Sequence, residues 1–465
     1  MSLVRVLPQE LTINAHRDGQ MEPTTAQKIS HIVCALQPED IPGPALDQAA
    51  WCALDLLGAA MAGFRQASAG SARGFARGFF PSGPAAVWFS SDSMSPLGAA
   101  FCNAVAGSAL DLDDGHRAAG GHPGASLVPS ALAVAQALHS SGRDVLAALV
   151  IGYEVAVRAA AARNPATMDT FSTGRWCGFG AAAIRCWLEG RGPEVLSQAM
   201  AISGIHAPLQ SASACSRLGH HTKEGIPWGT LTGLAAVDLA AQGFVGPLDL
   251  WDHPNYYRSQ AITDGFGEDW TILRTYFKPY ACCRWLHAAL DAWQTLVGQG
   301  LSPGEVERVE VFTFNRAINL NNHPDPASLE QAQFSLPFCL AVAALDGPQA
   351  LLPMSAELLG RPQLAAFARK VSLHHDSSIE AEFPARAGAR LVVHTAKGAF
   401  SQQVQNPRGD PANPLSAEEL TSKFYRLAGM IAERKKAEAV VKAVLELRKT
   451  GVEALFEALK ELKGE

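Results

Sequence analysis

The chain of 465 residues has neither a long uncharged apolar run nor a block of basic residues. No run of about eighteen apolar residues is free of charge, which argues against a membrane-spanning helix. The first 27 residues lack an apolar core followed by small residues, so no signal peptide is predicted. Lys and Arg number 38 against 44 Asp and Glu, with no basic stripe carrying interleaved aromatic residues. Nucleic acid is therefore not an expected partner.

Cysteine motifs for a metal are also missing. The nine cysteines are scattered, odd in number, and never spaced as CxxC, so a zinc or iron–sulfur site is not predicted. Most lie in apolar helical surroundings, where a thiol behaves as a small buried hydrophobic group. A reducing compartment, the cytoplasm, is the expected location.

Motifs for nucleotide or nucleophile chemistry are absent as well. The GFG at 178–180 lies in a helical context with no preceding strand, which excludes a dinucleotide fingerprint. No Walker loop, nucleophile elbow or HExxH is present. The expected chemistry therefore uses the chain's own side chains, without metal or organic cofactor.

What the chain does contain is apolar helix. Hydrophobic residues make up 48% and charged residues 18%, and the length predicts two or three domains. Apolar residues recur with helical spacing almost throughout residues 24 to 270. Individual helices are predicted at 24–36, 44–64, 129–138, 143–162, 178–188, 193–206 and 229–242.

The pattern changes after Phe277. Alternating residues predict strands within 303–315 and at 369–376, and a hairpin over 389–406 that turns at Lys397-Gly398. Helices are predicted between them at 284–297, 330–345 and 355–367, and the chain is helical again from Ser416. The predicted organisation is an N-terminal extension (1–23), an all-helical domain (24–272 with 408–465) and a smaller α+β domain (273–407).

The strongest functional signal lies at residues 108–130, SALDLDDGHRAAGGHPGASLVPS. Three carboxylates and two imidazoles (Asp111, Asp113, Asp114, His116 and His122) fall within twelve positions, separated by glycines. His and Asp are the usual proton-transfer groups, and glycine permits tight backbone beside a ligand. The alternative interpretation is a solvated acidic loop.

Two further clusters carry basic residues. In SRLGHHTKEG (216–225), Lys223 precedes a helix whose positive dipole end favours a neutral amine, and His220 and His221 could bind carboxylates. In FKPYACCRWLHAALDA (277–292), helical spacing brings Arg284, His287 and Asp291 near one face, beyond Lys278, and Arg284 and His287 are candidate substrate-binding residues. A plain surface loop and a structural Arg–Asp pair are the respective alternatives.

Residues 171–180, FSTGRWCGFG, form a weaker cluster. Arg175 in a glycine-containing loop before a helix is a possible anion site, although an ordinary helix–helix turn is the preferred interpretation. Together, the acids, imidazoles, lysines and arginines suit abstraction of a proton next to a carboxylate on a di- or tricarboxylic acid.

These motifs resemble the MmgE/PrpD family, which includes 2-methylcitrate dehydratase, cis-aconitate decarboxylase and iminodisuccinate epimerase. The resemblance rests on LDLDDGHRAAGGHPGA, GYEVAVR, HHTKEGIPWGTLTGLAAVDLAAQGFVGPLDLWD, KPYACCRWLHAALDA and AQFSLPFCLAVAALDG, which occur in this order. It implies a mostly α fold: a large all-helical domain completed by the C-terminal helices, and a smaller α+β lid domain. It also implies a homodimer without metal or organic cofactor.

By the same resemblance, Asp111, His122, Lys223 and Lys278 match the family's catalytic residues. Three positions depart from the family pattern. Gly115 stands where the decarboxylases have threonine, Phe171 or Ser172 where many members have histidine, and Phe338 where the decarboxylases have tyrosine. The groups available to replace the missing polar side chains on a differently shaped polyacid are His116, Arg175, His220, His221 and Arg284.

The leading hypothesis is a cofactor-independent lyase, similar to 2-methylcitrate dehydratase, that removes water or carbon dioxide from a small polycarboxylate. Lys223 or His122 would take the α-proton and Asp111 would orient or protonate, while Lys278 and Arg284 would bind carboxylates. The second hypothesis is an iminodisuccinate-type epimerase with two bases at one α-carbon. The third is a catalytically inactive dimeric scaffold.

Overall fold

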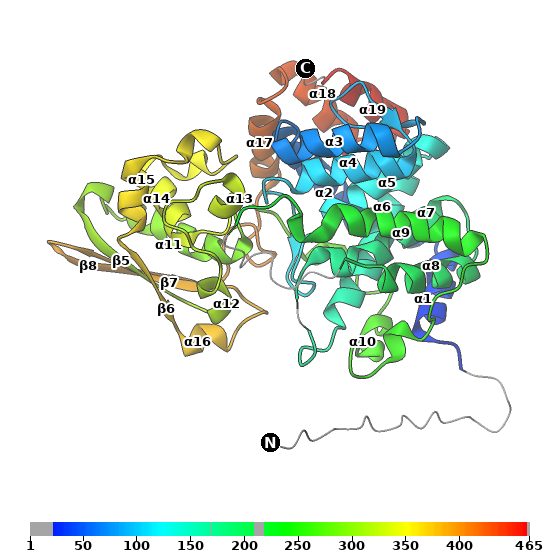
Figure 1. Ribbon diagram of the computed structural model, residues 1–465, viewed down its shortest axis with the longest axis horizontal. Helices are drawn as coiled ribbons and strands as arrows, with labels where there is room; N and C mark the ends of the chain where they lie inside the picture. Colours follow the sequence, from blue (N-terminus) through cyan, green and yellow to red (C-terminus); the bar gives the residue numbers. More distant parts are fainter. Residues whose placement is uncertain (1–21, 169, 209–217, 463–465) are drawn as a thin grey trace.

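A computed structural model describes residues 22–168, 170–208 and 218–462. Most of the predicted N-terminal extension and Cys215 lie outside these ranges. The fold is mostly α, as predicted, and has two units side by side: a large helical one and a smaller one built on a four-stranded sheet (Figure 1). None of the described helices is both long enough and apolar enough to span a membrane.

The helical unit begins as the local sequence dictates. Thr24 and Gln27 form a reciprocal capping box at the start of α1, which ends at Ala35. The unit contains α1 (Thr25–Ala35), α2 (Gly43–Gly63), α3 (Ala67–Phe79), α4 (Pro96–Ser108), α5 (Gly124–Leu138), α6 (Gly142–Ala161), α7 (Cys177–Leu188), α8 (Pro193–Ile205), α9 (Ile226–Ala241) and α10 (Ser259–Thr263). A short hairpin, β1 (Ala85–Ala86) with β2 (Ser93–Met94), joins α3 to α4.

Central helices of this unit are buried on nearly every side, which explains their almost uniform apolarity. Small residues let them approach closely: a Cβ on Gly180 would lie 2.5 Å from the carbonyl oxygen of Gly152. One predicted boundary is wrong. Helix α5 begins at Gly124 and contains Pro129, which was predicted to start it. The proline removes only one backbone hydrogen bond, and the buried turns on both sides continue the helix.

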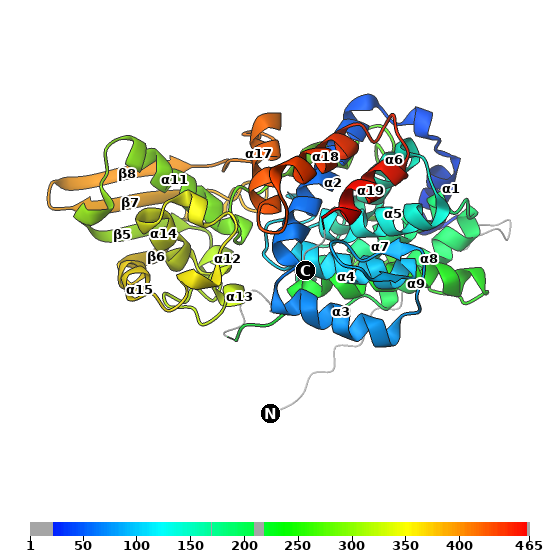
Figure 2. The same cartoon turned by 90° about the horizontal axis from the view of Figure 1, so that it is seen from above.

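The C-terminal helices return to the helical unit. Ser416 and Glu419 form a capping box on α17 (Ala417–Ala428), followed by α18 (Arg434–Leu445) and α19 (Val452–Lys460). Their apolar residues join the same hydrophobic core as α1 to α9. In Figure 2, α18 and α19 lie against the helical unit, and α17 stands where the two units meet.

The smaller unit has its own core beneath a four-stranded sheet of order β6-β5-β7-β8. β5 pairs parallel to β6 and antiparallel to β7, and β7 pairs antiparallel to β8. Alternate residues of β7 are buried, as its sequence predicts. The strands are β5 (Val306–Thr313), β6 (Val371–His375), β7 (Ala389–Thr395) and β8 (Gly398–Val404), and the helices are α11 (His287–Gly298), α12 (Asn315–Ile318), α13 (Leu329–Ala332), α14 (Leu336–Leu345), α15 (Pro362–Ala368) and α16 (Ser377–Glu380).

All three strand regions expected after Phe277 are present, with small differences. The hairpin turns at residues 396–397, one position before the predicted turn. The helix predicted over 330–345 is divided, because Ser335 caps a new helix, α14, with Pro337 in its first turn. The seam between the units includes one element that the sequence did not reveal, the pairing of β3 (Gly115–His116) with β4 (Thr275–Tyr276).

Candidate active site

The predicted site residues Asp111, Lys223 and Lys278 meet in a buried ion cluster. Lys223 Nζ donates to Asp111 Oδ1 at 3.0 Å, and Lys278 Nζ donates to Asp111 Oδ2 at 2.7 Å. Lys223 Nζ also donates to Gln333 Oε1 at 3.1 Å. Both carboxylate oxygens of Asp111 therefore accept from an ammonium group, which is the strong, charge-assisted form of hydrogen bond.

Backbone geometry aims these side chains. Asp111 has φ 53° just after α4, and Lys223 and Glu224 have φ 36° and 57° in the short 3-10 turn before α9. Side chains other than glycine rarely adopt this left-handed region, and such residues tend to cluster at functional sites. The β3–β4 ladder brings the chain just beyond Asp111 beside the chain just before Lys278.

His122 lies against the same cluster. Its Nε2 is 3.7 Å from Asp111 Oδ1, and its Nδ1 lies 3.0 Å from the carbonyl oxygen of Asp114 and 3.2 Å from Asp113 Oδ2. Because Nδ1 faces only oxygen acceptors, it carries a proton. The other ring nitrogen, Nε2, is the one directed toward Asp111.

Burial and charge oppose one another at Asp111 and Lys278. Burial by itself would raise the pKa of Asp111, but the ammonium groups of Lys223 and Lys278 hold that pKa well below its usual range. Burial by itself would lower the pKa of Lys278, but the Asp111 carboxylate raises it. The pair is therefore ionised at neutral pH.

The same competition sets the charge of His122. Burial would lower the pKa of the imidazole, but the Asp113 carboxylate outweighs it and raises the pKa to about 9. His122 is thus an imidazolium at neutral pH. Such a group donates a proton rather than accepting one.

The third acid of the loop, Asp114, has a structural role. Its Oδ1 accepts from the backbone N–H of Gly124 at the start of α5, and its Oδ2 accepts from the Tyr153 hydroxyl at 2.5 Å. Burial raises the pKa of Asp114 to about 7.

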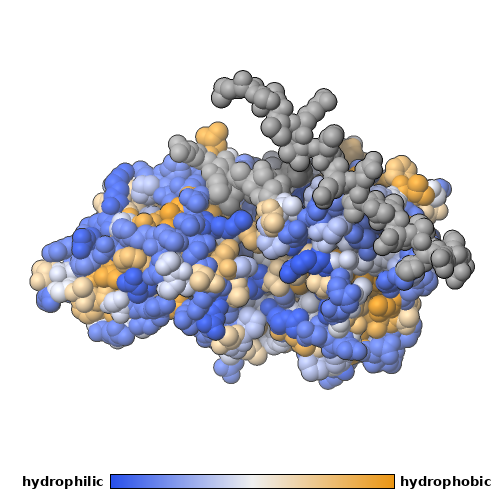
Figure 3. All heavy atoms as spheres, turned by 90° about the horizontal axis from the view of Figure 1, so that it is seen from below, coloured by the Kyte–Doolittle hydropathy of each residue, from blue (hydrophilic) through white to orange (hydrophobic). Residues whose placement is uncertain are grey.

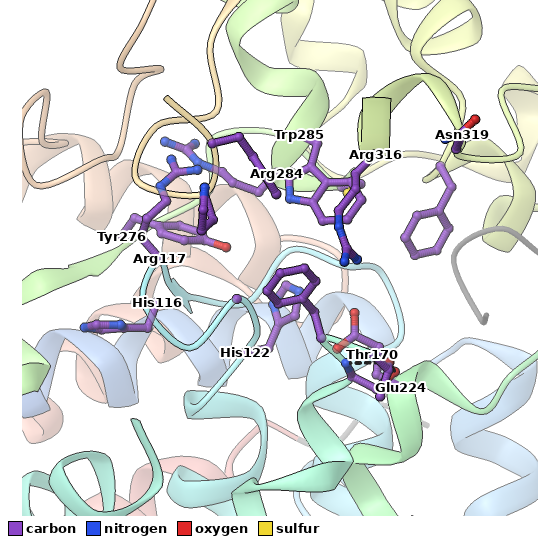
Figure 4. Close-up of a pocket in the computed structure, with 17 residues that line it drawn as sticks. His116, Arg117, His122, Thr170, Glu224, Tyr276, Arg284, Trp285, Arg316 and Asn319 are labelled. Atoms are coloured by element: carbon purple, nitrogen blue, oxygen red, sulfur yellow. Dashed lines mark hydrogen bonds between the residues drawn. The ribbon is translucent and has the colours of Figure 1, made fainter. Parts of the chain in front are cut away.

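A cavity of about 150 Å³ lies beside this cluster, between the two units (Figure 4). The helical unit contributes His122, Thr170 and Glu224 to its wall, and the α+β unit contributes Trp285 and Arg316. The further lining residues are His116, Arg117, Gly120, Phe171, Ser172, Tyr276, Cys283, Arg284, Asn319, Phe334, Phe383 and Pro384.

Four residues form the centre of the site, and their access to the cavity differs. They are Asp111, His122, Lys223 and Lys278. The His122 side chain is 10% exposed and lines the cavity, and the Lys223 side chain is 8% exposed and lines a smaller adjoining cavity that shares Glu224 and Phe334. Lys278 is fully buried. The cavity therefore opens directly on His122, whereas Lys278 contacts Asp111 and does not line it.

Two family models cover most of the chain. The MmgE/PrpD N-terminal domain matches residues 27–266, and the MmgE/PrpD C-terminal domain matches residues 280–447. The chain belongs to the MmgE/PrpD family.

Relatives of this MmgE/PrpD chain are similar over most of its length. A cis-aconitate decarboxylase of Aspergillus terreus is 25% identical, with 95% of this chain and 97% of the relative aligned. The cis-aconitate decarboxylase-like protein oryM of Aspergillus oryzae (strain ATCC 42149 / RIB 40) is 24% identical over 92% and 96%. A cis-aconitate decarboxylase of Homo sapiens is 26% identical over 78% and 79%.

Three residues predicted to bind substrate are held by the protein itself. His116 Nε2 lies 3.0 Å from the carbonyl oxygen of Thr271, burial lowers its pKa to about 4, and its ring points away from His122 (Figure 4). Arg284 donates to the carbonyl oxygens of Pro407 and Arg408 and pairs with Asp410 at 3.0 Å.

His287 is the third of these residues. Its Nδ1 accepts from Arg284 Nη1 at 3.0 Å, and its Nε2 donates to the carbonyl oxygen of Cys282 at 3.1 Å. Burial, with the Arg284 charge, holds the pKa of His287 well below its usual range. The Nη atoms of Arg284 and both ring nitrogens of His287 thus contact protein groups, whereas Arg284 Nε has no hydrogen-bond partner among the described residues. Substrate binding by these two residues stays a prediction.

The remaining predicted binding residues lie away from the main cavity wall. Arg175 is near Tyr257 and does not line the cavity. His220 lines the small cavity beside Lys223, and His221 lies 3.4 Å from Glu330 on the surface. Their sequence proximity to Lys223 was the basis of the expectation, and the sharp turn at Lys223 separates the side chains.

Several site residues were not predicted. Glu224 Oε2 accepts from the backbone N–H and the hydroxyl of Thr173, and the Thr173 hydroxyl oxygen in turn accepts from the backbone N–H of His122 at 3.0 Å. These contacts fix the position of His122. Thr173, Glu224 and Gln333 lie inside the motifs FSTGRWCGFG, SRLGHHTKEG and AQFSLPFCLAVAALDG, respectively. Nothing in the sequence around Arg316 distinguishes it from a surface arginine.

The three departures from the family pattern have distinct environments. A Cβ on Gly115 would lie 2.3 Å from the Tyr276 ring, so a threonine could not fit there without displacing Tyr276. Phe171 and Ser172 both line the cavity. Phe338 is 1% exposed in α14 and belongs to the core of the α+β unit.

Within the described ranges, no group of three or more His, Cys, Asp or Glu side chains is arranged to hold a metal ion. The acids of residues 111–114 are instead used by lysines, by His122 and by the start of α5.

Proposed function

We propose that this protein is a lyase that removes a small neutral molecule, preferentially carbon dioxide, from a small di- or tricarboxylic acid. The observation that carries the proposal is the Asp111 carboxylate held between Lys223 and Lys278, with the His122 imidazolium facing the cavity. The relatives named cis-aconitate decarboxylase support a polycarboxylate substrate and a lyase reaction.

Charge in the site suits an anionic substrate. In the buried cluster Lys223, Lys278 and His122 are cationic and Asp111 and Asp113 are anionic, and the cavity wall adds the cationic Arg316 and the anionic Glu224. Arg117 and Arg284 also line the cavity, and together they share the single carboxylate of Asp410. The cluster is buried, so its attraction for a carboxylate is weakly screened. The same field stabilises the negative charge that develops on carbon when a carboxylate leaves or an α-proton is removed.

The charge of His122 favours decarboxylation over the alternatives. When carbon dioxide leaves, the electron pair of the broken C–C bond stays on the substrate, and one proton must be added to carbon. His122 Nε2 supplies that proton, and the Asp114 carbonyl oxygen and the Asp113 carboxylate hold the imidazole in place through Nδ1. Loss of water needs a base as well as an acid, and two-base epimerisation needs two groups able to take up a proton. Here neither lysine is free to act as such a base, because both are ion-paired with Asp111.

The organisation around the site is part of the same proposal. The α+β unit, residues 273–407, acts as a lid, which is supported by the wall of the cavity that it supplies. Cofactor independence, a homodimer and a cytoplasmic location are expected from the sequence and the family resemblance.

The test is incubation of the protein in deuterated water with cis-aconitate, 2-methylcitrate and iminodisuccinate, followed by proton NMR. Loss of a carboxylate with one deuterium added to the adjoining carbon system is the expected result. Asp111→Asn and His122→Asn are each expected to slow it by about 10²- to 10⁴-fold, the usual contribution of a positioned acid. Asp92→Asn, which affects an exposed pair with Arg77, is the matched control.

Other outcomes contradict the proposal in different ways. A new alkene with loss of hydroxide identifies a dehydratase, and deuterium exchange at one α-carbon without bond loss identifies an epimerase. No reaction with any of the three acids removes the support for this substrate class. Full activity of Asp111→Asn and His122→Asn removes the assignment of the site.

A further inference from the structure

Three arginines line the cavity, and two of them are already occupied. Arg117 Nη2 donates to both carboxylate oxygens of Asp410, at 2.8 and 2.7 Å, and Arg284 Nη2 pairs with Asp410 Oδ1 at 3.0 Å. The Tyr276 ring also lies against both guanidinium groups, at 5.6 and 4.8 Å. These two arginines therefore form part of the protein's own framework.

Arg316 differs from both. It lies in α12 of the α+β unit, and its guanidinium carbon is 4.4 Å from the centroid of the Phe171 ring in the helical unit. Within the described part of the chain, it makes no ion pair within 4 Å and no side-chain hydrogen bond. Figure 4 shows it extending from the α+β unit toward the side of the cavity that holds Thr170, Glu224 and His122.

Stacking on an aromatic ring leaves the N–H donors of an arginine free to bind a ligand. The ring contacts the face of the guanidinium, whereas the N–H donors lie along its edge. A carboxylate can accept two parallel N–H bonds from that edge. A stacked arginine without an acidic partner is thus oriented for an incoming carboxylate, and it has fewer conformations to lose on binding.

The Phe171 ring is itself held in place. Its edges meet Trp285 and Phe383 of the α+β unit, with centroids 6.5 and 6.3 Å away. A Cβ on Gly120 would lie 2.3 Å from this ring, and Gly120 has φ +69°, so glycine is required for the ring to occupy this place. The glycine of the active-site loop therefore makes room for the surface on which Arg316 rests.

We propose that Arg316, stacked on Phe171, binds a carboxylate of the substrate that is remote from the carbon reacting at His122. This inference rests on the proposed function and names its substrate class: acids with at least two carboxylates, one placed beside His122 and one bound by Arg316. It also assigns to the α+β unit a direct contact with the substrate, so that closure of the two units would depend on that second carboxylate.

The first experiment measures binding without turnover. Tricarballylate, a tricarboxylate with no hydroxyl or double bond to lose, is titrated calorimetrically into the full-length protein. Butyrate, which has a single carboxylate, is titrated in parallel. Arg316→Met is expected to weaken tricarballylate binding by about 10- to 100-fold, the range for a charged hydrogen-bonded contact, and to reduce the preference for tricarballylate over butyrate. Arg316→Lys, which keeps the charge but not the fork, is expected to fall between the two.

Arg434→Met is the matched control, because Arg434 also stacks on an aromatic ring, that of Tyr425, in the helical C-terminal segment. It should leave tricarballylate affinity unchanged. Phe171→Leu removes the stacking partner and is expected to weaken binding by about 2- to 5-fold in wild type but not in Arg316→Met. With a substrate that the protein turns over, Arg316→Met should raise KM far more than it lowers kcat.

Wild-type protein that fails to bind tricarballylate overturns the inference, as does Arg316→Met protein that binds it equally well. Equal weakening by Arg434→Met would show a general charge effect and would also overturn it. The proposed lyase reaction fails separately: binding that depends on Arg316, together with no reaction in deuterated water, contradicts the reaction and leaves the carboxylate site standing.

Discussion

Burial acts on Asp111 and His122 against the charges that surround them. At Asp111 the effect of the two ammonium groups on the pKa exceeds that of burial, and at His122 the effect of the Asp113 carboxylate does so. Each residue is therefore ionised at neutral pH. The desolvation penalty of each charge is offset by its partners rather than by solvent. Removing any one of these charged side chains therefore leaves its partners buried without a compensating charge.

The pH dependence of the reaction follows from His122. Because the proposed reaction requires the protonated form of His122 and the pKa of His122 is about 9, kcat/KM should hold through neutral pH and fall as the pH rises through about 9. Asp113 is the group that most raises this pKa, so Asp113→Asn should move the falling limb to lower pH. A pH–rate series on both proteins checks this. An unmoved limb in Asp113→Asn would exclude His122 as the titrating acid.

Short elements at the seam set the shape of the cavity. The β3–β4 ladder contains only two residue pairs, Gly115 with Tyr276 and His116 with Thr275. Two-residue strands carry no detectable alternation, so the sequence could not predict them. Their effect is nevertheless large, because they bring the Tyr276 ring directly over Gly115.

Gly115→Thr is therefore expected to destabilise the fold by about 1 to 3 kcal/mol through overpacking against Tyr276. Urea unfolding measures the change. Gly115→Thr with Tyr276→Leu should recover much of the loss, because the leucine frees the space of the ring. Gly74→Ala is the control: a Cβ there meets nothing within 4 Å, and the substitution in α3 should stabilise slightly. Equal stability of Gly115→Thr and wild type would contradict the packing seen at β3–β4.

The two units of the molecule are connected through Asp410 as well as by the chain. This residue lies in the segment between β8 and α17, and it pairs with Arg117 of the helical unit and Arg284 of the α+β unit. The exposed surface in Figure 3 is mostly hydrophilic with scattered apolar areas, whereas Asp410 and Arg284 are buried. Asp410 therefore helps to set how the walls of the cavity face one another.

Removing the charge of Asp410 should leave the buried Arg284 and the partly buried Arg117 without their shared partner. Asp410→Asn is expected to lower the free energy of unfolding by about 3 to 5 kcal/mol, the range for breaking buried pairs. Asp346→Asn removes an exposed pair with Arg361 and should cost no more than about 1 kcal/mol. Chemical denaturation compares the two variants. Equal losses would show that the Asp410 pairs contribute no more than a surface contact.

Element types were predictable because each depends on local chemistry. The capping residues Thr24 and Ser416, the helical periodicity of α2 and the alternation of β7 all act over a few neighbours. The predicted start of α5 at Pro129 was wrong, because the buried packing of that helix outweighs one lost hydrogen bond. The boundaries of the two domains remain predictions.

The sequence by itself pointed to Asp111, His122, Lys223 and Lys278, because motifs dense in chemically active groups contain them and the resemblance to the MmgE/PrpD family singles them out within those motifs. Only the tertiary structure decided which groups are available. The lysines reach Asp111 across 112 and 167 positions of sequence, and Arg284 is bound by protein groups while Arg316 is not. Availability of a side chain depends on its neighbours in space, and local sequence patterns hold no record of those neighbours.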